Sequence, residues 1–93
     1  MLLKLRPTPI VALNRAVAVA MADGASWGLR VLDDLAEELS GFHLFAATRG
    51  ELLLRDGQVA AAVEAFDHAL ATVGNDRERD HLRARRAAAA ARW

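Results

Sequence analysis

Cysteine and tyrosine are absent from this 93-residue sequence, and proline occurs only twice. Without cysteine the chain can form neither a disulfide framework nor a thiolate metal site. The formal charge at pH 7 is zero, so no whole-chain field attracts nucleic acid or an anionic membrane. No apolar run approaches the ~20 residues that a membrane span needs, and the apolar head, residues 1–5, is too short for a signal peptide. We therefore expect a cytoplasmic protein with no membrane partner.

Large side chains are also scarce, since the chain has only three Phe and two Trp. Apolar residues nevertheless make up 54% of the sequence, and alanine is the commonest of them. A chain of this length fits one small domain. Its core is therefore expected to be thin, with elements that approach each other closely.

The apolar residues recur at helical spacing, and no segment alternates at period two with β-branched residues. The sequence therefore predicts an all-α fold without a sheet. We expect five helices, over residues 9–22, 27–39, 42–56, 58–73 and 76–92. The first is apolar nearly all round, which predicts burial on more than one side.

Capping residues mark the ends of these helices. Thr8 is expected to cap the first, with Pro9 at its first position. Ser26 is expected to cap the second, and Asn75 the fifth, where Glu78 completes a capping box.

Glycine is expected to end the middle helices. We expect Gly57 to end the third helix and Gly74 to end the fourth, both in the left-handed conformation.

The sequence repeats itself. A shift of 34 residues places Arg15 on Arg49, Ala16 on Gly50 and Asp33 on Asp67. Small residues fall on small ones and large apolar residues on large apolar ones, which indicates one helix-turn-helix unit used twice. The unit is too thin to bury its apolar face alone, and the fifth helix then covers the second copy. The residues expected to pack the repeats are Ala16, Gly28, Leu32, Gly50, Leu53, Ala62, Phe66 and Ala69.

This 34-residue unit resembles the tetratricopeptide repeat. With His43 at its first position, Gly50, Ala62 and Phe66 fall at positions where the family has small, small and aromatic residues. The resemblance implies a right-handed stack of two antiparallel hairpins followed by a terminal helix. The repeats would be residues 9–42 and 43–76, and the terminal helix residues 77–92.

A narrower resemblance covers nearly the whole chain. The string TPIVALNRAVA at residues 8–18, the following Asp23-Gly24, and GFHLFAATRGELLLRDG at residues 41–57 resemble the C-terminal extension of a group of bacterial extracytoplasmic-function sigma factors. The resemblance implies a non-catalytic regulatory module that contacts the sigma domains, RNA polymerase or a regulator. DNA would be bound only through domains upstream of this chain, and residues 1–8 would be a linker or the end of a preceding domain. The alternative is a freestanding helical-repeat adaptor that binds a peptide or a partner protein.

Several polar residues are candidates for partner binding. First-helix positions that line the concave face of the resembled repeats are occupied by Asn14, Val17, Met21, Thr48, Glu51 and Arg55. The repeat-equivalent Arg15 and Arg49 are added because two arginines in an inner groove could bind a carboxylate. The alternative for these two is structural, each bracing its own hairpin through an acid such as Asp33 or Asp67.

Catalytic and metal-binding patterns are not evident, so we expect no enzyme and no cofactor. The three histidines, His43, His68 and His81, make no HExxH motif, and a metal site needs three or four converging ligands. Both serines, Ser26 and Ser40, lie at predicted helix ends, where capping accounts for them.

Two further contacts are considered for the surface. The last predicted helix is basic toward its end, but it has no interleaved aromatics, which disfavours nucleic acid. Its charge is complementary to the acidic second helix, which leaves a homodimer open. Trp27 and Trp93 are candidate anchors for such contacts, and Trp27 could instead fill the junction between hairpins.

Overall fold

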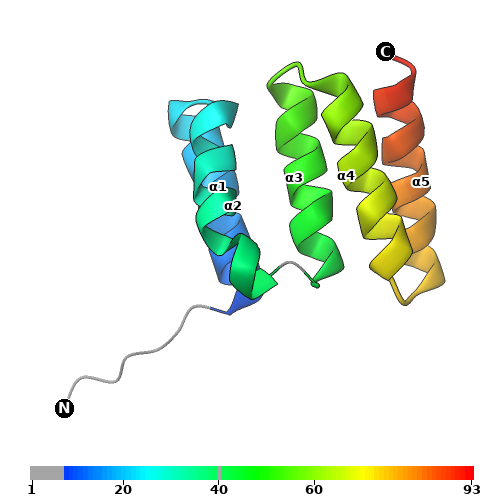
Figure 1. Cartoon of the computed structure of the whole chain (residues 1–93), viewed down its shortest axis with the longest axis horizontal. Helices are drawn as coiled ribbons and strands as arrows, with labels where there is room; N and C mark the ends of the chain where they lie inside the picture. The colour runs from blue at the N-terminus through cyan, green and yellow to red at the C-terminus, as the bar shows by residue number, and fades with distance from the viewer. Residues whose placement is uncertain (1–7, 40) are drawn as a thin grey trace.

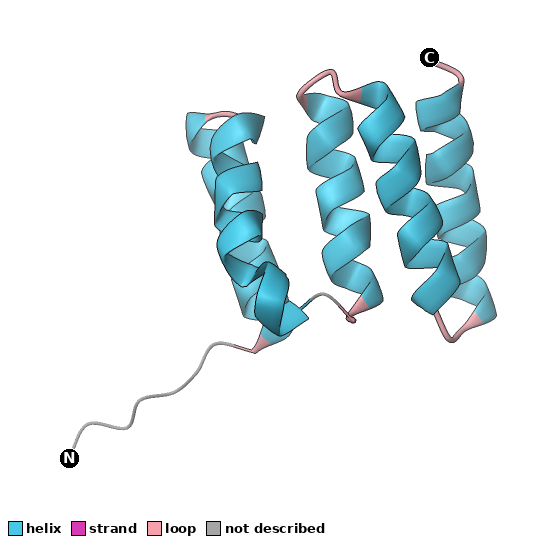
Figure 2. Cartoon of the chain, viewed as in Figure 1, coloured by secondary structure: helices cyan, strands magenta, loops and turns pink. Residues whose placement is uncertain are grey.

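The computed structural model describes residues 8–39 and 41–93, and this part of the chain is built from helices alone. The helices are α1 (Pro9–Asp23), α2 (Ala25–Leu39), α3 (His43–Arg55), α4 (Val59–Thr72) and α5 (Asp76–Ala90) (Figures 1 and 2). The predicted all-α class and its five helices are confirmed. The predicted linker, residues 1–8, lies outside the described residues except for Thr8. Ser40 also lies outside them.

Consecutive helices pack against one another along the chain. The pairs α1–α2 and α3–α4 form two hairpins, α2 contacts α3 between them, and α4 contacts α5. Helix α1 also touches α3 directly. Figure 1 shows α3, α4 and α5 side by side, with their chain direction alternating. In chain order, α1, α3 and α5 are the first helices of successive pairs.

Two helices begin at the caps that the sequence predicts. The Thr8 hydroxyl accepts a hydrogen bond from the Val11 amide at 3.2 Å, and Pro9 opens α1. The Asn75 side chain accepts from the Glu78 amide at 2.8 Å at the start of α5. These bonds satisfy amide groups that have no partner within the helix.

Other predicted helix ends are wrong. Ser26 does not cap α2, because that helix already begins at Ala25, directly after Gly24. Gly24 has φ 109°, so a single residue reverses the chain between α1 and α2. Gly57 has φ 83°, as expected, but Gly74 has no positive φ. Instead α4 ends at Thr72, and its C-cap residue Val73 has an extended backbone.

The core is thin and filled from every helix, and all eight predicted packing residues are buried. Phe66 and Leu32 are the largest fully buried side chains. A Cβ atom added at Gly50 would lie 2.9 Å from the Phe66 ring, so the aromatic ring fills the space that glycine leaves. The α1–α2 crossing is just as close, because a Cβ atom on Gly28 would lie 2.6 Å from that of Ala20.

Helix α1 is less buried than its composition predicts. Its packed face consists of Ala12, Leu13, Ala16 and Ala20. Ile10 and Val11 are each 55% exposed, and Met21 is 67% exposed. The expectation that α1 is buried on more than one side is therefore wrong for the described residues, because no described helix precedes α1 in the stack.

Candidate partner-binding groove

The first hollow of interest lies between α1 and α3 and has a volume of about 260 Å³. Both helices contribute positions that the sequence analysis assigned to a concave face. From α1 come Val17 and Met21, and from α3 come Thr48, Glu51, Leu52 and Arg55. The guanidinium of Arg55 reaches back to the Met21 sulfur.

A second hollow, of about 460 Å³, lies between α3 and α5. Thr48 and Glu51 line this hollow as well as the first, so the two are adjacent along α3. We call the combined surface on α1, α3 and α5 the inner groove. Its α3–α5 half is also lined by His43, Leu44, Ala47, Phe66, Arg77, Glu78, His81, Leu82 and Arg85.

A bidentate ion pair crosses the floor of the inner groove. Arg85 Nε donates to Glu51 Oε2 and Arg85 Nη2 donates to Glu51 Oε1, both at 2.7 Å. The hydrogen bond and the charge of Glu51 raise the pKa of Arg85 above its ordinary value. This fork geometry fixes both side chains and holds α5 to α3.

A histidine and a glutamate close one end of the groove. His43 Nε2 lies 2.6 Å from Glu78 Oε2, which is an ion-pair distance when the imidazole is protonated. The Nε2 atom is buried and lacks a hydrogen bond of acceptable geometry within the described part of the chain. The groove is therefore lined by paired charges together with apolar side chains such as Leu44, Ala47 and Leu82.

Five of the eight candidate partner-binding residues line the inner groove, namely Val17, Met21, Thr48, Glu51 and Arg55. Asn14 and Arg15 are exposed on α1 and line neither half of it. Arg85 was not among the candidates. It falls 34 residues after Glu51, so the repeat itself carried a signal for it.

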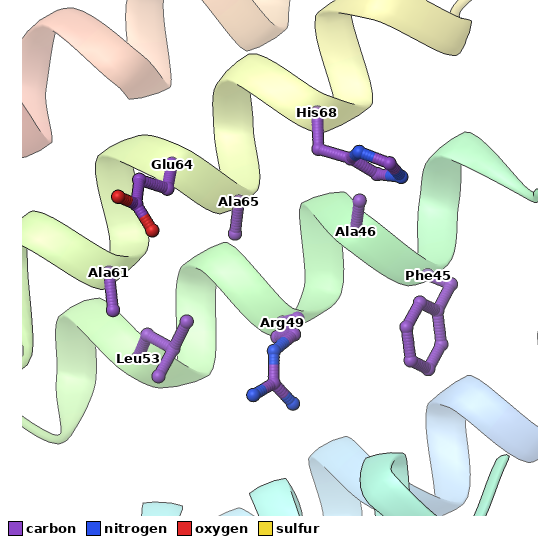
Figure 3. Close-up of a pocket in the computed structure, with 8 residues that line it drawn as sticks. All are labelled: Phe45, Ala46, Arg49, Leu53, Ala61, Glu64, Ala65 and His68. Carbon is purple, nitrogen blue, oxygen red and sulfur yellow. The ribbon is translucent and has the colours of Figure 1, made fainter. Parts of the chain in front are cut away.

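Arg49 lies elsewhere. It lines a separate hollow of about 450 Å³ with Phe45, His68 and residues of α4. Figure 3 shows its side chain pointing away from α4 toward the ribbons of the first hairpin. There its Nη1 donates to Asp33 Oδ1 on α2 at 2.8 Å.

The structural alternative for Arg49 needs one correction. A brace within its own hairpin was expected, but Arg49 on α3 pairs with Asp33 on α2 and so joins the two hairpins. Asp67 on α4 likewise pairs forward, with Arg86 on α5. No ion pair to Arg15 occurs within residues 8–39 and 41–93.

Replacing Arg49 with alanine is expected to lower the free energy of unfolding by about 0.5–1 kcal/mol. The loss is small because the two side chains are 37% and 63% exposed, so water screens the pair. Urea denaturation of the 93-residue chain measures it, and Arg15→Ala is the matched control, expected to change nothing. An equal loss in both variants would contradict the assignment of the brace.

The basic residues of α5 are mostly engaged within the fold. Arg85 and Arg86 bind acids on α3 and α4, and Arg79 binds Asp76 and the Val73 carbonyl. Nor is the acidic face of α2 wholly available for a second molecule, because Asp33 already binds Arg49. Trp27 is 52% exposed and lies beside Arg30, whose guanidinium carbon is 4.9 Å from the ring centroid. It therefore does not fill the junction between hairpins.

Candidate metal sites and membrane-spanning helices are both absent from the described residues. No group of three or more His, Asp or Glu side chains there could hold a metal ion. None of the described helices has the length and apolar character needed to cross a membrane.

Comparison with known proteins adds one relative. No protein-family model matches the chain, and no solved structure matches it. An uncharacterized protein of Rhizobium meliloti (strain 1021) is 40% identical over 80 residues. The match covers 86% of this chain and 19% of the relative, so the chain spans about a fifth of the relative's length.

Proposed function

We propose that this chain is a non-catalytic protein-interaction module of a sigma factor, which regulates transcription initiation in the bacterial cytoplasm. In this proposal its helices form tetratricopeptide-like repeats. The partner is the sigma factor's own upstream domains, RNA polymerase or a regulator. The resemblance of residues 8–18 and 41–57 to the extension of extracytoplasmic-function sigma factors supports the transcriptional part.

The observation that carries the interaction part is the inner groove. Its two hollows share Thr48 and Glu51, one lying between α1 and α3 and the other between α3 and α5. A segment lying along it would meet α1, α3 and α5 in turn. Paired charges such as Glu51 and Arg85 stay fixed before binding, so little ordering entropy is lost there when a partner binds.

The mechanism follows from competition between contacts. A partner that inserts a segment into the inner groove would hold this module in place. It would thereby change how often the promoter-binding domains are free to engage a promoter. A coupling of 1–3 kcal/mol between the two events changes the equilibrium constant between engaged and free domains by about 5–150-fold. The freestanding adaptor remains the second candidate, since the same groove would serve a peptide from another protein.

The proposal is tested by filling the inner groove in the full-length gene product. Thr48→Trp places a large ring at the residue that the two hollows share, and Arg55→Glu reverses a charge at the exposed rim. We expect each to weaken binding to the upstream sigma region or to core polymerase by at least about tenfold. Run-off transcription with core polymerase should change in parallel. The melting temperature of the 93-residue chain should change little.

Ala88→Trp supplies the control, because Ala88 is exposed on α5 and does not line the groove. It should leave binding and transcription unchanged. Loss of affinity for a peptide of another protein, with transcription unaffected, would instead support the adaptor. Unchanged binding in both groove variants, with intact folds, would contradict an interaction role for the inner groove.

A further inference from the structure

One side of α1 is exposed although apolar residues dominate it. We define the outer face of α1 as Val11, Arg15, Ala18 and Ala22, which recur at helical spacing and are all exposed. Val11 alone leaves 55% of its surface in water. Such a face on the end helix of a stack is unusual, because terminal units of repeat proteins carry a polar outer side.

The repeat shows what this face contacts in the second unit. A shift of 34 residues carries Val11, Arg15 and Ala18 onto Phe45, Arg49 and Leu52 of α3. All three face the preceding hairpin or are buried there. Phe45 is only 7% exposed and Leu52 only 3%. Arg49 binds Asp33, and the Leu52 side chain lies 3.0 Å from where a Cβ of Gly28 would be.

Helix α5 has a related ion pair on this side at a different repeat position, because the Arg49 equivalent, Arg83, is exposed and Arg86 is used instead. Its Arg86 is the equivalent of Leu52 and pairs with Asp67 on the preceding helix, α4. Asp67 is itself the repeat equivalent of Asp33. On both α3 and α5, therefore, an arginine on this side is held by an aspartate from the helix before it. Arg15, the repeat equivalent of Arg49, lies on the same side of α1 and has no such acid among the described residues.

The two ends of the stack differ in kind. Helix α5 exposes no Val, Leu, Ile, Met or Phe, and its exposed residues are charged or alanine, apart from His81. That end is suited to water. The end formed by α1 exposes valine and alanine around one arginine, so it is suited to a partner helix that brings apolar surface and one negative charge.

We propose that the outer face of α1 receives a helix from the polypeptide that precedes this chain in its full-length protein, with a carboxylate of that helix bound to Arg15. This rests on the proposed function, in which the module follows other domains. Chain of sufficient length exists in the relative, of which this module matches only 19%. The extended backbone of Thr8 begins α1 sharply, as those of Phe42 and Asn75 begin α3 and α5. The occupant would pack on α1 as α2 packs on α3.

Thiol labelling tests the proposal directly, because the chain has no cysteine of its own. Ala18→Cys is made in the 93-residue chain and in the full-length gene product, after any other cysteines are changed to serine. We expect maleimide to react at least about tenfold more slowly with the full-length protein. Ala88→Cys, on the exposed side of α5, should react at the same rate in both.

Arg15→Glu provides the second measurement. It should leave the melting temperature of the 93-residue chain unchanged but restore fast labelling of Ala18→Cys in the full-length protein. Equal labelling of Ala18→Cys in both forms would overturn the proposal. If the 93-residue chain is also labelled slowly, and more slowly at higher protein concentration, the face is covered by a second copy of the chain. That result would also overturn the proposal. Neither readout involves polymerase, so the outcome is separable from a failure in transcription.

Discussion

Replacing Phe66 with alanine is expected to lower the free energy of unfolding by about 3–5 kcal/mol. The side chain is fully buried and fills the gap left by Gly50 on the facing helix. Truncation removes its apolar contacts and leaves a cavity between α3 and α4 that helices pinned by other contacts cannot close. Small domains have only about 5–15 kcal/mol of stability, so the variant should be close to unfolding. Thermal and urea denaturation of the 93-residue chain measure the loss.

A coupled variant separates this packing from general loss of apolar volume. Gly50→Ala alone should destabilise the chain, because its new methyl group would lie 2.9 Å from the Phe66 ring. In a Phe66→Leu background those ring atoms are gone, and alanine should instead gain about 0.5–1 kcal/mol of helix propensity. The same effect of Gly50→Ala in both backgrounds would show that the ring and the glycine do not share one space.

The helices and the small packing positions could be predicted from the sequence because both depend on local or periodic signals. Helical spacing of apolar residues located all five helices, and the caps at Thr8 and Asn75 depend only on residues three positions away. The 34-residue shift aligned Gly50, Ala62 and Phe66 with Ala16, Gly28 and Leu32, and all six residues are buried. Ser26 failed as a cap because Gly24 alone turns the chain.

The candidate site was predicted less completely because it depends on contacts between helices distant in sequence. Thr48, Glu51 and Arg55 were placed on a concave face from their repeat positions. The partner of each charge was not recoverable in this way. Arg49 binds an acid on the hairpin before its own, and Glu51 binds an arginine on the helix after its hairpin. Such pairings depend on how the hairpins are rotated against each other, which the spacing within one hairpin does not specify.

Replacing Gly28 with alanine is expected to be the second most damaging single change, with a net loss of about 2–3 kcal/mol. The added Cβ would lie 2.6 Å from Ala20 Cβ, 2.8 Å from the Ala16 carbonyl oxygen and 3.0 Å from Leu52 Cδ1. Two of these atoms belong to, or are attached directly to, the backbone of α1 and cannot rotate away. The helices α1 and α2 must therefore separate, which also disturbs the contact of α2 with α3. The melting temperature should fall by roughly 4–8 °C for each kcal/mol lost.

Gly74→Ala is the matched control for this change. Nothing lies within 4 Å of a Cβ at Gly74, and its φ is not positive, so the effect should stay within about 0.5 kcal/mol. A further variant, Gly28→Ala with Ala20→Gly, removes the closest clash but keeps the carbonyl contact, so it should recover only part of the loss. Helix propensity alone predicts that Gly28→Ala raises the free energy of unfolding, by about 1 kcal/mol for alanine over glycine inside a helix. A raised melting temperature in Gly28→Ala would therefore show that the α1–α2 crossing is wider than the structure has it.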